Sequence, residues 1–227
     1  MIDRSILLRP ASASLAQTAH DRFLQALFDR RIEPGARLSQ GELTALLDMP
    51  VAPLRDALRV LQTEGWVTIH ARSGIEVRKP DFALVRSSYQ MRLILERAAV
   101  RVFAEMAPKE AIAAAEARHR MVIEELRGQD LTVETAQVLE QVDFGFHQQV
   151  VRVLDNPLIS EAYQRAQGFV QLTRLDRAFR LAAPLVVRTM EEHLTILRAC
   201  AARNADAAEA ALELHFSRAM QRAIGFF

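Results

Sequence analysis

Four residues in the second half of the chain could together bind a metal ion. Asp143 and His147 are four positions apart, so on a helix both side chains project from one face. His193 and His215 lie in two later helical segments, which would run antiparallel and could bring the imidazoles together. One carboxylate and three imidazoles suit a divalent metal, Zn²⁺ first, with Ni²⁺ or Mn²⁺ as alternatives. Taken singly, each histidine also fits an ordinary surface or core position.

A second group of residues, in the first third of the chain, could contact DNA. Arg55 and Arg59 are four apart on one face of a predicted helix, whose first residues could reach base edges in the major groove. Arg37 and Arg72 could add phosphate or minor-groove contacts, and Gly74 would let the backbone approach the duplex closely. The same spacing is equally compatible with solvated arginines on an ordinary helical domain.

Short elements separated by glycine and proline fill residues 12–80. The pair Ser39 and Glu42 has the spacing of a capping box, Pro53 suits a first helical turn, and Gly65 is placed to end a helix. The predicted elements are helices over 12–31, 40–48 and 52–64, then a β-hairpin with strands over 66–70 and 75–78. This order predicts a winged helix-turn-helix domain over residues 12–80.

Long amphipathic helices fill the rest of the chain, after a boundary at Lys79-Pro80-Asp81. The predicted helices cover 82–106, 109–127, 131–154, 157–181, 185–203 and 205–225. Short connections favour antiparallel neighbours, so residues 81–227 are predicted to form an all-α antiparallel helical bundle. The fold class is therefore mainly α.

Bulk properties exclude several classes of protein. The chain has 227 residues, of which 50% are hydrophobic, so it can form two globular domains. No apolar run is long enough for a membrane span and the N-terminus lacks a signal-peptide core, so we expect a cytoplasmic protein without a membrane partner. The single cysteine, Cys200, excludes a disulfide framework and is expected to be buried. A net charge of +1 does not by itself indicate a nucleic-acid binder.

The first part resembles the winged helix of the GntR family of transcription regulators. The resemblance rests on Pro34-Gly35-Ala36-Arg37-Leu38, Glu42-Leu43, Pro53-Leu54-Arg55-Asp56-Ala57-Leu58, Leu61, Glu64-Gly65, and Gly74 with Val77. It implies DNA contacts at Arg37, Ala52, Arg55 and Gly74. The sequence departs from the family where Pro50-Val51-Ala52 replaces the usual Ser-Arg-Thr, which removes one arginine and two hydroxyl donors.

The second part resembles the FCD ligand-binding domain of the FadR-like GntR regulators. The matching motifs are Arg92-x-x-x-Glu96, Asp143-x-x-x-His147, Asn156-Pro157, Glu192-His193-x-x-Ile196-Leu197 and Ala208 to His215. The resemblance implies that Asp143, His147, His193 and His215 bind the metal. It also implies a small organic acid bound to the metal and held by an arginine.

Arg92 is the candidate for holding the carboxylate of that acid, although it could instead form a salt bridge with Glu96. Arg174 or Arg188 could supply a second arginine. His119, between Arg118 and Arg120, is predicted to lie on a solvated face and is assigned no site.

We therefore expect a ligand-responsive transcription regulator, a repressor rather than an enzyme, which binds a palindromic operator as a homodimer. One alternative is a metal-dependent helical-bundle enzyme that activates water, with Glu192 or Glu213 as general base. Another is a degenerate regulator whose winged helix binds other proteins, as the change at Pro50-Val51-Ala52 would allow.

Overall fold

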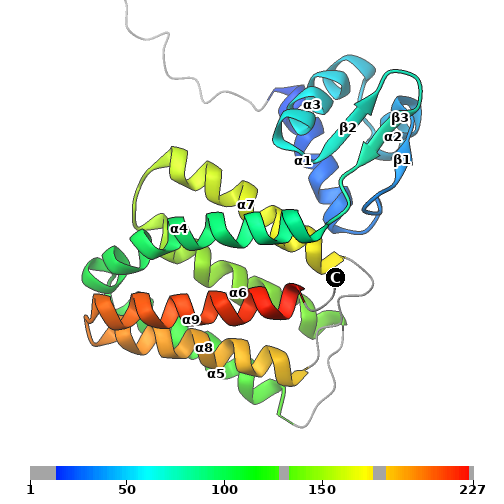
Figure 1. Ribbon diagram of the computed structural model, residues 1–227. Helices are drawn as coiled ribbons and strands as arrows, with labels where there is room; N and C mark the ends of the chain where they lie inside the picture. The colour runs from blue at the N-terminus through cyan, green and yellow to red at the C-terminus, as the bar shows by residue number, and fades with distance from the viewer. Residues whose placement is uncertain (1–13, 128–132, 176–182, 225–227) are drawn as a thin grey trace, which may run out of the picture. The chain divides into compact units, whose positions relative to one another are not determined.

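The computed structural model describes residues 14–127, 133–175 and 183–224, and for residues 133–137 it describes the backbone alone. The chain forms two compact units that divide between Lys79 and Pro80 (Figure 1). The predicted helix ends at residues 12–13, 131–132, 176–181 and 225 lie outside the described residues. Within the described residues, no helix is both long and apolar enough to span a membrane.

The N-terminal unit is a winged helix, as predicted. Its elements are α1 (Leu15–Phe28), β1 (Arg37–Leu38), α2 (Gln40–Leu47), α3 (Val51–Glu64), β2 (Val67–His70) and β3 (Gly74–Val77). The strands form an antiparallel sheet in the order β1-β3-β2. The sequence predicted the β2–β3 hairpin but not β1, because two residues are too few to show the alternation of a strand.

Helix α3 has its apolar face against α1, and this orients the opposite face outward. Leu54, Leu58 and Leu61 are buried in the core of the unit, whereas Arg55 and Arg59 are exposed. The helix ends at Gly65, which adopts a left-handed conformation with φ of 91°. Its N-cap, Pro50, makes no side-chain hydrogen bond, so the change from Ser-Arg-Thr leaves this helix without a side-chain cap.

The C-terminal unit is an all-α bundle, again as predicted. It consists of α4 (Phe82–Met106), α5 (Lys109–Glu125), α6 (Val133–Arg152), α7 (Pro157–Leu175), α8 (Ala183–Ala201) and α9 (Ala205–Ile224). Helix α4 packs against α6, α7, α8 and α9, while α5 packs against α6 and α8. Figure 1 shows α4 and α9 lying side by side. Val100, Leu197 and Leu212 are fully buried in the shared core, which fixes the facing sides of α4, α8 and α9.

Gly74→Ala is expected to destabilise the N-terminal unit by more than about 1 kcal/mol, because Gly74 has a positive φ that disfavours a side chain. An added Cβ would also lie 2.7 Å from the carbonyl oxygen of Leu38. Gly41→Ala is the matched control: this glycine is helical and exposed, so alanine should stabilise by about 0.5–1 kcal/mol. Urea unfolding checks both, and equal effects of the two variants would contradict the argument.

Candidate metal centre

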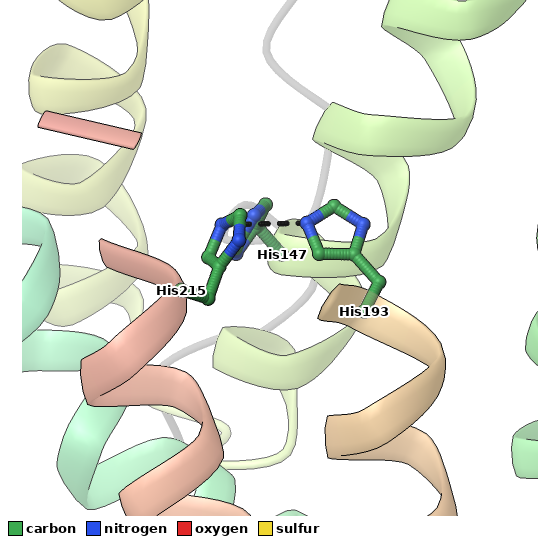
Figure 2. A group of neighbouring side chains, drawn as sticks. All are labelled: His147, His193 and His215. Atoms are coloured by element: carbon green, nitrogen blue, oxygen red, sulfur yellow. Dashed lines mark hydrogen bonds between the residues drawn. The ribbon is translucent and has the colours of Figure 1, made fainter. Parts of the chain in front are cut away.

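Three histidines from three helices meet inside the C-terminal unit. His147 comes from α6, His193 from α8 and His215 from α9, and all three side chains are buried. One ring nitrogen from each lies within 4.8 Å of the others. Figure 2 shows the rings converging, with Nε2 of His193 lying 3.3 Å from Nε2 of His215. The bundle thus gathers three imidazoles that are far apart in the sequence.

Asp143 completes the group one helical turn before His147. Its side chain is buried, and Oδ1 lies 3.5 Å from Nε2 of His193 and 3.7 Å from Nε2 of His147. Two ligands of a tetrahedral ion with bonds of 2.0–2.1 Å would be roughly 3.3 Å apart. The structure brings the four residues named from the sequence together, with three of the separations at 3.3–3.7 Å and those among the histidines within 4.8 Å.

Carboxylates hold two of the three imidazoles from outside the cluster. Nδ1 of His147 lies 2.5 Å from Glu96 Oε2, and Nδ1 of His215 lies 2.9 Å from Glu192 Oε2. An ionised carboxylate can only accept, so Nδ1 carries the hydrogen in each contact, and a ring that is neutral then has its lone pair on Nε2. Carboxylate partners of this kind orient histidine ligands in metalloproteins. Arg222 in turn donates to both oxygens of Glu192.

Burial and neighbouring charges give the cluster the ionisation that a metal requires. Burial lowers the pKa values of His147 and His193 well below 6.5, so both rings are neutral at pH 7 and offer a lone pair. Burial alone would raise the pKa of Asp143, but the Arg174 guanidinium outweighs it and holds that pKa well below its usual range. One carboxylate and three imidazoles form a donor set that fits a divalent transition metal.

Arg92 lies beside this group and forms a salt bridge with Glu96. The sequence left this salt bridge open as the alternative to holding the carboxylate of an acid. Nε and Nη2 of Arg92 lie 2.9 and 2.8 Å from Oε1 of Glu96, and both residues are buried. Burial raises the pKa of Glu96 to about 7, although Arg92 acts in the opposite direction. The contact of Nη2 with Glu96 is an ion pair without hydrogen-bond geometry. Within the described residues, this buried nitrogen has no hydrogen-bond partner. Arg92 therefore retains donor capacity despite its salt bridge.

The other predicted partners lie at the edge of the cluster. Arg174 is bound to Asp143, with Nη2 and Oδ2 2.5 Å apart. Arg188 is exposed and lines a cavity of about 160 Å³ that reaches His215 and Glu192. Glu213 is partly exposed and lies 2.9 Å from Arg97. Glu192 and Glu213 are the candidate general bases of the alternative enzyme. Glu192 accepts hydrogen bonds from His215 and Arg222, and Glu213 forms a salt bridge with Arg97.

The prediction that His119 lies on a solvated face is wrong. Its side chain is 1% exposed, and its Nε2 lies 3.1 Å from Nδ1 of His193. The neighbours Arg118 and Arg120 suggested a polar surface, but His119 shares the buried face of α5 with Ile112, Ala115 and Val122. This helical spacing was the signal that could have identified it.

The residues named for DNA contact are spread over α3, the sheet and the β2–β3 turn of the N-terminal unit. Arg55 and Arg72 are exposed, and Arg59 lies 3.6 Å from Asp56 on the same helix. Arg37 lies in β1, where its Nη2 donates to Glu76 Oε2 at 3.1 Å. Ala52 is exposed at the start of α3, while the close approach of Gly74 to Leu38 gives that glycine a role within the sheet.

Comparison with known proteins identifies both units. The FCD domain matches residues 87–218, more than half of the chain, and the model described as "Bacterial regulatory proteins, gntR family" matches residues 15–77. The HTH-type transcriptional repressor RspR of Escherichia coli (strain K12) is 26% identical over 186 residues, which cover 81% of this chain and 78% of that protein.

Two solved structures share the fold across almost the whole chain. A GntR protein from Rhodococcus sp. RHA1 is 24% identical, with a TM-score of 0.73 and coverage of 93% of this chain and 98% of its own. E. coli McbR/YncC is 16% identical, with a TM-score of 0.73 and coverage of 92% and 97%. With a winged helix, a helical bundle and family matches to both, this chain belongs to the GntR family of bacterial regulators, in its FCD-domain subfamily.

Proposed function

We propose that the chain is a transcription repressor that binds DNA as a homodimer and responds to a small organic acid at a metal ion in the helical unit. The observation that carries the sensing part is the meeting of Asp143, His147, His193 and His215 in the interior of the bundle. Family membership and the similarity to RspR, a named repressor, support the DNA-binding part.

The metal would be held by these four side chains, with Zn²⁺ as the first candidate and Ni²⁺ or Mn²⁺ as alternatives. Nitrogen and oxygen donors of intermediate softness suit all three ions. When bound, the ion supplies a Lewis-acid position to which a carboxylate oxygen can attach. The chain's own residues keep His147 and His193 neutral and keep Asp143 ionised.

The charges around the cluster favour an anionic effector. Each of the three carboxylates near the cluster is paired with a guanidinium group, and a divalent ion would add two positive charges. These groups are Asp143, Glu96 and Glu192 on one side and Arg174, Arg92 and Arg222 on the other. An organic acid would offset the added charge, and the unused donor capacity of Arg92 would give it a second point of attachment.

DNA binding would be through α3 and through the wing, which is the β2–β3 hairpin. Two winged helices related by a two-fold axis would read a palindromic operator, with Arg55 and Arg59 of each α3 facing the major groove. Arg37, Arg72 and the exposed start of α3 at Ala52 would contact the flanking backbone.

Arg55→Ala is expected to reduce binding to the DNA upstream of the protein's own gene to a non-specific level. A lost base contact costs about 1–3 kcal/mol, and a dimer loses it twice. Fluorescence anisotropy across a salt series measures the affinity, and Arg31→Ala, an exposed arginine outside α3, is the control. An Arg55→Ala protein that binds as tightly as wild type contradicts the proposal. If the wild-type protein is dimeric but binds this DNA only at the non-specific level, the result would instead favour a winged helix that binds other proteins.

Zn²⁺ is expected to stabilise chelator-stripped protein by about 2.7 kcal/mol when the free ion exceeds its Kd a hundredfold. His193→Ala should remove most of this increment, because a ligand nitrogen is lost. His20→Ala is the control, since His20 contacts Glu64 in the other unit. Calorimetric melting measures the increment. No response of the stripped wild type to Zn²⁺, Ni²⁺ or Mn²⁺ rules out the proposed site.

Succinate is expected to bind metal-loaded protein more tightly than chelator-treated protein. Arg92→Lys should weaken that binding while the metal stays bound, because lysine keeps the positive charge but loses the forked pair of donors. Arg86→Lys is an exposed control on the same helix. Isothermal titration calorimetry tests both points. Equal succinate affinity with and without metal, or in wild type and Arg92→Lys, would count against this effector site.

A further inference from the structure

His119 is a buried titratable side chain to which the proposed function gives no role. It projects from α5 into the cluster, and its ring meets those of Phe146 and His193 edge-on, at centroid distances of 5.3 and 5.2 Å. A polar ring in such a place requires hydrogen-bond partners, since an unpaired one would be costly. Both ring nitrogens have such partners, and these partners fix where the hydrogens lie.

The hydrogen-bond chain can be followed outward from the backbone. Nδ1 of His119 lies 2.7 Å from the carbonyl oxygen of Ala115, which can only accept. Nδ1 of His119 therefore carries the hydrogen, which in the neutral tautomer leaves Nε2 as an acceptor. Nε2 lies 3.1 Å from Nδ1 of His193, which must then donate. These hydrogen bonds leave Nε2 of His193 without a hydrogen.

Two lone pairs then face each other across the cluster. Nδ1 of His215 donates to Glu192 and Nδ1 of His193 donates to His119, so in the neutral form of each ring the lone pair is on Nε2. The two Nε2 atoms are 3.3 Å apart, and in this pair of tautomers neither carries a hydrogen. Adjacent lone pairs repel unless a cation lies between them, so this arrangement suits a bound ion.

His119 occupies for His193 the position that carboxylates occupy for the other two rings. Glu96 holds His147 and Glu192 holds His215, each through Nδ1. A neutral imidazole accepts a hydrogen bond less strongly than a carboxylate, yet it imposes the same tautomer without adding a buried charge. All three imidazoles thereby direct Nε2 into the centre.

We propose that His119 is a positioning residue of the metal centre, which holds His193 in the Nδ1–H tautomer and aims its Nε2 at the ion. This inference rests on the proposed function, since it assumes that the centre binds a divalent metal. His119 itself does not touch the ion.

His119→Phe tests the proposal, because phenylalanine nearly preserves the ring's shape but cannot accept a hydrogen bond. Its Zn²⁺ affinity, measured by chelator competition, is expected to fall by roughly 10- to 100-fold, as when outer partners of ligands are removed. His119→Gln should recover most of the affinity, since its amide can both donate to Ala115 and accept from His193. His20→Phe, the same exchange in the N-terminal unit, should leave the affinity unchanged.

The outcomes separate this inference from the proposed function. A wild-type protein that binds no Zn²⁺ contradicts the proposed function itself. Wild-type binding with equal affinity in His119→Phe, or a loss in His119→Gln as large as in His119→Phe, overturns the role of His119. If neither variant folds, ¹⁵N NMR of the metal-free wild type decides: a hydrogen on Nδ1 of His193 supports the proposal, and one on Nε2 overturns it.

Discussion

The helical unit depends on a set of ionisable side chains that have been removed from water. Asp143 and three histidines lie in the interior, where a polar group without a partner costs roughly 1–3 kcal/mol or more. Each has an outer partner on a helix other than its own: Arg174 on α7, Glu96 on α4, His119 on α5 and Glu192 on α8. The hydrogen bonds that satisfy these groups therefore also fix how the six described helices are arranged around the centre.

This coupling gives the centre a means of control over the bundle. An ion or an acid that changes the geometry at Asp143 or His193 acts on α6, α7 and α8 together, because Asp143 is hydrogen-bonded to Arg174 and lies 3.5 Å from His193. Such a ligand can alter DNA affinity if it binds one arrangement of the two winged helices more tightly than another. Pro80, at the division between the units, lies on the chain segment that connects them.

Local patterns predicted the elements and not the contacts between them. Apolar periodicity predicted the bounds of α4, and the spacing of Asp143 and His147 indicated a shared face, since both features depend on one helix. The bond between Glu96 and His147 spans 51 positions and could not be read from periodicity. His119 was predicted to be exposed because Arg118 and Arg120 flank it, although its spacing from the apolar residues of α5 indicated the buried face. Strand β1 was not predicted because it is only two residues long.

The central claim is that the centre in the helical unit controls the affinity of the winged helix for DNA. The most direct test is anisotropy of labelled upstream DNA at one salt concentration, comparing protein loaded with metal and succinate with chelator-treated protein. A coupling of 1–3 kcal/mol predicts a change in the DNA dissociation constant of about 5- to 150-fold. Identical dissociation constants for the two forms, both bound specifically, would contradict the account.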